Sequence, residues 1–301
     1  MSAIALTSVS KTFRQGRRTP VRALDGISLR VEAGEVFGFV GPNGAGKSTT
    51  IKAMLNIITD YAGEISLFGV PARDAAARRA VGYVPEAPAL YEQLTPLEIL
   101  RAGLDLHGVR RDHPDNWCLS WLERFSIAHV ARRKVRELSK GTVQRTALAH
   151  ALAVSPRLLI LDEPLSGLDP VGRKDVVEIL AEYRKEGGTI FLTSHVLHDV
   201  ERLANRFGLI HKGELKTIQS PNELVGDHDL VTVRSFGPGP LSGLEEESGG
   251  RYFAEIRRPA LWPLLQRLEA AGHTLIEVKP TLTLESAFMR YLGLEKGGGN
   301  P

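Results

Sequence analysis

Several features that would place a protein outside the cell or inside a membrane are missing from this sequence. It has a single cysteine, Cys118, so no internal disulfide can form, which is typical of a reducing compartment. Its apolar runs, such as residues 158–161, are far shorter than the roughly eighteen residues that a membrane-spanning helix needs. The first residues lack the basic start and long apolar core of a secretory signal. We therefore expect a cytoplasmic protein that reaches a membrane only through a partner.

A strong net charge of either sign is also missing. The 301 residues include 38 Lys and Arg against 35 Asp and Glu, so the formal net charge is only +3. This bias is too weak to indicate nucleic acid or an anionic membrane as a partner, and we expect no nucleic-acid binding. The hydrophobic share of 43% and the charged share of 24% are ordinary for a globular protein. The length suits one full-sized domain and a smaller one.

The first two thirds of the chain have the pattern of an α/β domain. Three short apolar runs are typical of buried parallel strands: 36–40, 158–161 and 189–193. Residues 3–9 and 27–32 are predicted to form an antiparallel edge. One helix is predicted at 47–57, and another begins after Asp169, a candidate N-cap that a proline follows. This order of elements predicts a mainly parallel sheet with helices on its faces.

The sequence predicts a division of the chain near residue 220. Residues 1–220 form the α/β domain, with an inserted helical subdomain at about 86–140, where no strong strand pattern occurs. Residues 221–301 form a small α+β accessory domain with a disordered, glycine-rich tail. Its predicted elements are strands at 229–236, 251–258 and 274–279 and helices at 260–272 and 284–293. We expect the leucine-bearing helix at 260–272 to pack on this small sheet; stabilising a dimer and a regulatory role are the alternatives.

A glycine-rich loop follows strand 36–40 and matches the pattern G-x-x-x-x-G-K-S/T. It consists of Gly41, Pro42, Asn43, Gly44, Ala45, Gly46, Lys47, Ser48 and Thr49. Glycines let successive backbone N–H groups turn toward a phosphate, and the helix that follows points its positive dipole end at the same place. Lys47 supplies a cation for the last two phosphates, and the Ser48 hydroxyl is a ligand for Mg²⁺. The loop predicts a site for a nucleoside triphosphate with Mg²⁺.

Two carboxylates come directly after the apolar run 158–161. At the end of a buried strand beside a phosphate loop, Asp162 can hold Mg²⁺ or its waters. The adjacent Glu163 can polarise an attacking water, which is general-base catalysis. The alternative is that both residues simply begin a solvated loop, and the phosphate loop upstream favours the catalytic interpretation.

Three further segments occur in a fixed order. Residues 138–145 read Leu-Ser-Lys-Gly-Thr-Val-Gln-Arg, residues 164–169 read Pro-Leu-Ser-Gly-Leu-Asp, and His195 follows a predicted strand. Together with the phosphate loop and the carboxylates, this order closely resembles the ATP-binding-cassette ATPases over residues 3 to about 220. The resemblance implies a phosphate-loop NTPase fold, ATP and Mg²⁺ as ligands, and ATP hydrolysis coupled to transport.

The resemblance also implies roles for single residues. Glu163 matches the general base, Asp162 the aspartate that supports Mg²⁺, and His195 the histidine that contacts the γ-phosphate. For His195 the alternatives are an ordinary loop histidine or a chance metal pair with His198. Phe13 matches the aromatic residue that stacks on adenine, and a buried core phenylalanine is the alternative.

Ser139 and Gly141 match a signature segment that, in the family, contacts the γ-phosphate bound by the other subunit. Asp169 matches a loop that touches the opposite subunit. Ser139 also has the pattern of a helix N-cap. The resemblance thus implies a homodimer that closes head to tail around two ATP molecules. It also implies a polytopic membrane permease as partner, which would hold the chain on the inner face of the cell membrane.

The sequence departs from the commonest family pattern at three positions. Lys140 and Thr142 replace a glycine and a glutamine of the signature, and Glu86 replaces a glutamine that senses Mg²⁺ and the γ-phosphate. Glu86 can serve as a Mg²⁺ ligand, or it can be an exposed turn residue. The departures resemble a bacterial exporter branch in which ATPase and permease are separate chains. Residues 85–95 fit that branch too, because in the family this stretch faces the permease; a loop that covers the core is the alternative.

These observations rank the candidate functions. An exporter ATPase comes first, and the departures disfavour an import ATPase. A soluble cassette ATPase that acts on ribosomes or DNA is disfavoured by the single cassette and by the lack of sustained heptads. A GTPase or small-molecule kinase would leave the signature segment unexplained, and the sequence has no guanine-reading Asn-Lys-x-Asp motif. The transported substrate is not encoded in such a chain.

Overall fold

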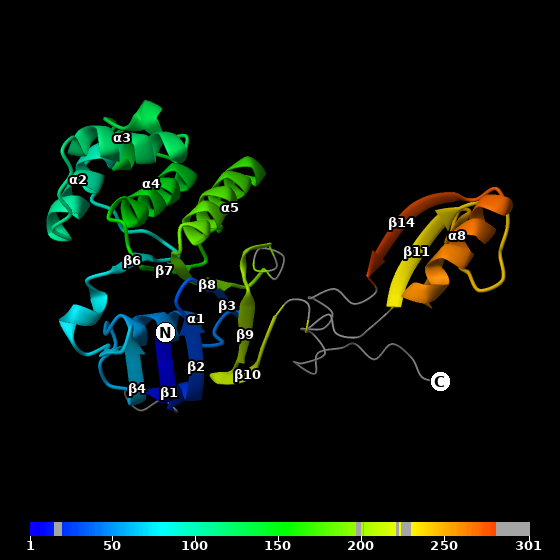
Figure 1. The fold of residues 1–301 in the computed structure, drawn as a ribbon, viewed down its shortest axis with the longest axis horizontal. Helices are drawn as coiled ribbons and strands as arrows, with labels where there is room; N and C mark the ends of the chain where they lie inside the picture. Colours follow the sequence, from blue (N-terminus) through cyan, green and yellow to red (C-terminus); the bar gives the residue numbers. More distant parts are fainter. Residues whose placement is uncertain (15–19, 197–199, 201, 221–222, 224–229, 281–301) are drawn as a thin grey trace. The chain divides into compact units, whose positions relative to one another are not determined.

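A computed structural model describes residues 1–14, 20–196, 200, 202–220, 223 and 230–280 of the chain (Figure 1). The chain divides into two compact units, Met1–Ile218 and Gln219–Pro301. None of the helices in the described residues combines the length and the apolarity that a membrane crossing requires. The expected helix at 284–293 and the glycine-rich tail lie outside the described residues.

The first unit is built on a six-stranded sheet with the strand order β10-β9-β3-β8-β7-β6. Its strands are β3 (Val36–Val40), β6 (Val81–Val84), β7 (Leu158–Asp162), β8 (Thr189–Ser194), β9 (Arg206–His211) and β10 (Glu214–Gln219). The pairs β3–β8, β3–β9, β6–β7 and β7–β8 are parallel, and every residue of β3, β7 and β8 is buried. The predicted, mainly parallel sheet is confirmed. The sequence did not predict β6, β9 and β10: a glycine lies within the short apolar runs of β6 and β9, and polar residues interrupt β10.

A second, four-stranded sheet forms the antiparallel edge, with the order β2-β1-β4-β5. Its strands are β1 (Ser2–Phe13), β2 (Val21–Glu32), β4 (Ala62–Leu67) and β5 (Val70–Pro71). β1 and β2 are longer than expected and pair as far as Phe13 and Val21. The register shifts near Ser8 and Ser10, but the hydroxyls of Ser28 and Ser10 accept hydrogen bonds from the N–H groups of Ser8 and Gly26. These polar positions hid the continuation of both strands in the sequence.

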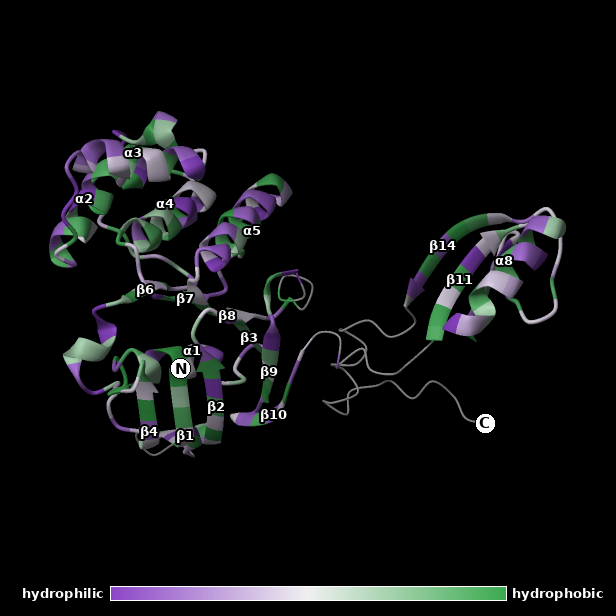
Figure 2. Cartoon of the chain, viewed as in Figure 1, coloured by the Kyte–Doolittle hydropathy of each residue, from purple (hydrophilic) through white to green (hydrophobic). Residues whose placement is uncertain are grey.

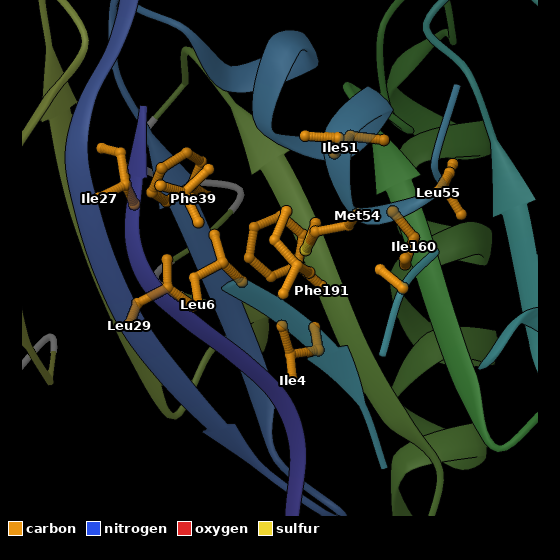
Figure 3. Close-up of a cluster of buried hydrophobic side chains, with 14 of the residues drawn as sticks. Ile4, Leu6, Ile27, Leu29, Phe39, Ile51, Met54, Leu55, Ile160 and Phe191 are labelled. Carbon is orange, nitrogen blue, oxygen red and sulfur yellow. The ribbon is translucent and has the colours of Figure 1, made fainter. Parts of the chain in front are cut away.

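The core of the first unit lies between the two sheets. Ile4, Leu6, Ile27 and Leu29 of the antiparallel edge face Phe39 and Phe191 of the central sheet and Ile51 and Met54 of helix α1 (Lys47–Met54) (Figure 3). Phe191 stacks on Phe37 with ring centroids 5.9 Å apart. Burial of a side chain of this size stabilises the fold by roughly 1.5–3 kcal/mol. The core therefore fixes α1, and with it the phosphate loop, against the sheet.

Helix α1 ends three residues earlier than the predicted helix at 47–57. Asn56 adopts a left-handed backbone with φ +55°, and Ile57 is 60% exposed. The N–H of Ile57 donates to the carbonyl of Lys52, which closes the helix with a wide turn. The apolar residues past Met54 extended the periodic pattern, although asparagine commonly terminates a helix in this conformation.

Helices α2 to α5 lie on the opposite side of the six-stranded sheet from α1 (Figure 1). They are α2 (Pro96–Leu106), α3 (Pro114–Arg124), α4 (Lys140–Ala153) and α5 (Pro170–Lys185), with short 3₁₀ turns at Ala75–Arg78, Ala128–Val130 and Val135–Glu137. Thr95 and Glu98 form a capping box at the start of α2. The Asp169 side chain accepts the N–H of Gly172 and caps α5, which confirms that expected N-cap. Residues 86–137 contain helices and no strand, as expected.

The second unit has its own antiparallel sheet, with the order β12-β13-β11-β14. Its elements are β11 (Leu230–Phe236), β12 (Glu245–Ser248), β13 (Arg251–Arg257), a 3₁₀ turn (Arg258–Ala260), α8 (Leu261–Ala270) and β14 (Thr274–Pro280). Figure 2 shows both hydrophobic and hydrophilic residues along β11, and its buried Val231 and Val233, two positions apart, share one face of the strand and of the sheet. Leu264 and Leu268 of α8 pack on Val231, Val233 and Ala254 of that face. The leucine-bearing helix therefore packs on its own sheet, as expected.

Candidate functional site

The phosphate loop connects the buried strand β3 to helix α1. Gly44 and Gly46 have φ values of +79° and +116°, which side-chain-bearing residues rarely adopt. At Gly46 a Cβ atom would also lie 2.6 Å from the carbonyl oxygen of Ala23, so that position has no room for a side chain. The sequence therefore places glycine where the backbone must turn around a small anion.

The loop surrounds a cavity of about 530 Å³. Its lining combines loop residues with side chains from distant parts of the chain: Val21, Arg22, Ala23, Pro42, Asn43, Gly44, Ala45, Gly46, Lys47, Ser48, Thr49, Glu86, Glu163 and Lys212. The cavity thus brings together most of the predicted phosphate-loop residues, Glu86 and Glu163. Gly41 lies behind it, because a Cβ atom there would be 2.2 Å from the carbonyl oxygen of Ile210.

Lys47 is buried at the floor of this cavity, with 6% of its surface exposed. Its ammonium group donates to the carbonyl of Gly41 at 2.7 Å and to that of Pro42 at 3.4 Å. It also lies 3.3 Å from Oε1 of Glu163. Oε1 is itself buried and accepts no hydrogen bond from the residues that the structure describes. A buried cation beside a carboxylate oxygen with unused hydrogen-bonding capacity fits a triphosphate and a polarised water, so the residues present match the predicted ligands.

Asp162 and Glu163 lie where β7 leaves the sheet, and both are buried. The hydroxyl of Thr193 on β8 donates to Oδ1 of Asp162 at 2.6 Å and accepts the N–H of Glu163 at 3.0 Å. Glu163 has a left-handed backbone with φ +49°. Such a conformation costs about 1–3 kcal/mol for a residue with a side chain, and surrounding contacts must hold it. Thr193 provides one of those contacts through the N–H of Glu163, and sequence reasoning did not identify it.

His195 lies beside Glu163 on the side away from the phosphate loop. Its Nδ1 is 2.8 Å from Oε2 of Glu163, and its backbone N–H donates to the same oxygen at 3.3 Å. Both residues line a smaller cavity of about 100 Å³. Glu163 therefore lies between two cavities, with one carboxylate oxygen toward Lys47 and the other toward His195. His198 lies outside the described residues, so the possible histidine pair is not described.

Tyr83 of β6 is a half-buried tyrosine near Asp162. Burial, and secondly the negative charge of Asp162, raises the pKa of Tyr83 to about 12. The phenol therefore stays protonated at any working pH and can only donate or accept a hydrogen bond. It adds no negative charge to this part of the site.

Phe13 stands at the end of β1, 39% exposed, and does not line the phosphate-loop cavity itself. Its cross-strand partner, Val21, does line it. The buried ammonium of Lys11 lies 4.7 Å from the centre of the Phe13 ring and pairs with Asp60 at 2.5 Å. Phe13 is therefore an exposed ring at the rim of the cavity and not a core residue. Sequence reasoning missed Lys11, whose burial depends on residues far along the chain.

The start of α4 is a separate part of the molecule that lies outside the phosphate-loop cavity. Ser139 caps the helix by accepting the N–H of Thr142, and the two hydroxyls lie 2.8 Å apart. This confirms the expected N-cap. Ser139 and Lys140 are exposed, and Gly141 is half-buried. The structure does not bring Ser139 and Gly141 together with Lys47 and Glu163 within one chain.

A short loop, residues 164–168, links Glu163 to the start of α4 and to α5. The side-chain amide of Gln144 donates to the carbonyl of Pro164 at 3.1 Å, and both groups are buried. Arg145 lies 3.5 Å from Oδ1 of Asp169 and also donates to the carbonyl of Phe125 at 3.1 Å. The loop is thus held to α4 at two points. Gln144 of α4 bonds Pro164, the first residue of the loop, and Arg145 of α4 contacts Asp169, the residue that follows the loop. These contacts could not be read from the sequence, because they join residues that are about 20 positions apart.

Comparison with known proteins gives a consistent match. The family model described as "ABC transporter" matches residues 24–166. The chain is 33% identical to Nod factor export ATP-binding protein I of Rhizobium etli, over 98% of this chain and 95% of that one. It is 36% identical to an ABC transporter ATP-binding protein of Synechocystis, over 82% of this chain and 70% of that one.

Solved structures match in the same way. The ATP-binding subunit of an ABC transporter superimposes with a TM-score of 0.67 at 30% identity, over 74% of this chain and 91% of that one. A bacterial ABC transporter cassette, solved as a dimer, superimposes with a TM-score of 0.66 at 26% identity, over 72% of this chain and 98% of that one. The matching part of these structures confirms the expected phosphate-loop α/β fold.

Proposed function

Because the chain belongs to the ATP-binding subunits of ABC transporters, we propose that it hydrolyses ATP and drives an exporter whose membrane-spanning part is a separate polypeptide. One observation carries the catalytic part of this proposal. Lys47 and Glu163, which are 116 positions apart (163 − 47), meet 3.3 Å apart at the phosphate-loop cavity. A buried cation for phosphate oxygens and a carboxylate for water are the two groups that triphosphate hydrolysis needs.

The residues divide the work as follows. The backbone N–H groups of the phosphate loop and the ammonium of Lys47 bind the phosphates, and Phe13 stacks on the adenine from the rim. Ser48, Asp162 and Glu86 would hold Mg²⁺, which offsets the charge on the phosphate oxygens when it is bound. Glu163 accepts a proton from the attacking water at Oε1, and His195 orients the carboxylate through Oε2.

We further propose that two copies close head to tail, so that Ser139 and Gly141 of one copy complete the ATP site of the other. Their position outside the phosphate-loop cavity, on an exposed helix start, supports this arrangement. The dimeric state of a cassette with the same fold is consistent with it. Binding of two ATP molecules then closes the dimer, and hydrolysis opens it.

The test of this cycle uses Glu163→Gln, which removes the base but keeps the shape of the side chain. We expect phosphate release to fall by roughly 10²–10⁴-fold, the range for loss of general-base assistance. With ATP and Mg²⁺ the variant should elute as a dimer in size-exclusion chromatography with light scattering. Glu186→Gln, which changes an exposed glutamate at the end of α5, is the matched control. A Glu163→Gln variant that stays monomeric, alone and with its membrane partner, would refute the cycle.

The exporter part of the proposal is supported by the relatives that are named for Nod factor export and match nearly the whole chain. Residues 85–95 are the proposed contact with the permease. Tyr91 is 79% exposed there, while the carbonyls of Glu92 and Leu94 accept N–H groups of Arg136 and Val135, which hold the loop on the helical part of the unit. An exposed aromatic residue on an anchored loop is typical of a contact surface.

A purification from membranes tests this contact. The tagged chain should copurify with a polytopic membrane protein, and Tyr91→Ser should weaken that association. Ile57→Ser, which changes another exposed apolar residue, is the control. Copurification with ribosomes or DNA would instead favour a cassette ATPase outside transport.

A further inference from the structure

Two residues that depart from the commonest pattern of the family carry opposite charges and form no ion pair within the part of the chain that the structure describes. Glu86 and Lys140 are both exposed. Among the residues that the structure describes, neither has an oppositely charged group within 4.0 Å. By contrast, Lys47 pairs with Glu163, and Arg145 pairs with Asp169. The two departures are therefore electrostatically incomplete in the monomer.

The negative charge of Glu86 is unfavourable where it stands. Glu86 lines the phosphate-loop cavity together with Glu163. A triphosphate in that cavity would bring further negative charge close to both carboxylates, and like charges at contact distance repel strongly at a partly buried site. Lys47 is already engaged by Glu163 and two carbonyls. Arg22, which pairs with Asp25, and Lys212 also line the cavity, but within the described residues neither lies within 4.0 Å of a Glu86 carboxylate oxygen. A further cation near Glu86, besides the Mg²⁺ that it would help to hold, would lower this penalty.

The positive charge of Lys140 is unfavourable for the same kind of reason. Lys140 is the first residue of α4, and the first turn of this helix has no acidic residue. A cation there adds to the positive end of the helix dipole, which disfavours it. Its stem lies along the loop between Glu163 and Asp169, since a Cβ atom on Gly167 would be 3.2 Å from Cε of Lys140. The ammonium thus lies beside Gly167, at the exposed start of the helix.

We propose that Glu86 forms an ion pair with Lys140 of the partner subunit when two ATP-loaded copies close. This inference rests on the proposed head-to-tail dimer, in which the start of α4 of one copy approaches the phosphate-loop cavity of the other. The two departures then compensate each other: the carboxylate gains a cation, and the cation gains an anion. Each closed dimer contains the pair twice, so it contributes to the choice of a second copy of this chain as partner.

Charge reversal tests the pair in the Glu163→Gln background, where ATP is not consumed. Glu86→Lys or Lys140→Glu should each raise the dimer dissociation constant with ATP and Mg²⁺ by roughly tenfold or more, because two like-charged contacts replace two ion pairs. The double variant restores opposite charges and should recover at least tenfold of that loss. The recovery should shrink as salt rises from about 0.1 M toward 1 M, since salt screens exposed charges. Analytical ultracentrifugation gives the dissociation constants.

Two controls separate this pair from other effects of charge. Lys134→Glu makes the same change of net charge at another exposed lysine of the helical part and should leave the dissociation constant within about threefold. The affinity of each monomeric variant for a fluorescent ATP analogue corrects for direct effects of Glu86 on the nucleotide. If the effects of the two charge reversals on the dissociation constant are simply additive, the ion pair is refuted while the proposed dimer is not. If the Glu163→Gln parent forms no dimer at all, the proposed cycle falls and this inference falls with it.

Discussion

The two segments that the proposed reaction needs, the phosphate-loop edge of the sheet and the start of α4, are built in opposite ways. At the sheet edge Lys47, Asp162 and Glu163 are each less than a tenth exposed and are bonded to one another or to Thr193. At the start of α4 the Ser139 side chain is exposed, and among the described residues its hydrogen bonds stay within its own helix turn. A single chain therefore assembles the buried groups around the phosphate loop, while the start of α4 exposes its polar groups on the surface. Mutations should separate these two segments.

The largest effect is expected at the sheet edge, from Lys47→Ala. Loss of the buried ammonium removes the cation for the phosphates and leaves the Glu163 carboxylate buried without its partner. We expect ATP turnover to fall at least a hundredfold and binding of a fluorescent ATP analogue to the monomer to weaken strongly. Lys52→Ala, at an exposed position of the same helix, should have little effect. Nucleotide turnover that survives Lys47→Ala would remove the basis of the proposed function.

The next effect belongs to the start of α4, and it should appear only in the dimer. Ser139→Ala removes the hydroxyl proposed to reach the other copy's ATP, so turnover should fall roughly tenfold to hundredfold. The affinity of the monomer for ATP should not change. Loss of the N-cap itself should lower the free energy of unfolding by about 0.5–2 kcal/mol, which thermal unfolding measures. Weakened ATP binding in the Ser139→Ala monomer would show that the two segments are not separate.

A smaller effect on ATP turnover is expected from Thr193→Val, a substitution at the sheet edge. The substitution keeps the shape but leaves the N–H of Glu163 and an oxygen of Asp162 without a hydrogen bond. Buried groups that lose a partner cost about 1–3 kcal/mol each. We expect a corresponding fall in the free energy of unfolding by urea, with a reduced kcat as the backbone of Glu163 loses support. Thr193→Ser should recover most of both, and equal losses in the two variants would argue for packing instead.

The smallest effect concerns the pH response of α4. Burial, and secondly the charge of His107, lowers the pKa of His150, which packs against Gly103 of α2. Since the folded pKa lies below the unfolded value of 6.5, the unfolded chain binds the proton more readily as the pH falls below 6.5. The melting temperature should therefore decrease from pH 7 toward pH 5, and His150→Gln should reduce that slope. His129→Gln, at an exposed position, should not.

Much of the sheet edge could be predicted because its signals are local. Glycine is required at positions 44 and 46 by the local turn. The carboxylates mark the place where the apolar run of β7 ends. The helix caps at Ser139 and Asp169 were found for the same reason, since a cap bonds within three residues. In the second unit, the strands predicted at 229–236, 251–258 and 274–279 correspond to β11, β13 and β14.

What the sequence did not reveal depends on distant partners. Thr193 can bond Asp162 and Glu163 because β8 lies beside β7 in the sheet. The buried ammonium of Lys11 is paired with Asp60, which lies far along the chain. The end of α1 was misjudged because apolar residues continue past Asn56. β12, with the sequence Glu-Glu-Glu-Ser, has no apolar signal and forms by pairing with β13. Periodicity detects faces that are buried, so it misses strands whose side chains are all exposed.

The loop at 164–168 has a consequence for how two ATP molecules would be used. It follows Glu163, the proposed base for the chain's own nucleotide, and lies against the start of α4, which is proposed to serve the neighbour's. In the proposed dimer, a movement of Glu163 as phosphate leaves would reach the start of α4 through this loop. Under the proposed pairing, neither nucleotide can be spent in isolation, and a hybrid of one intact copy with one Glu163→Gln copy should run far below half speed.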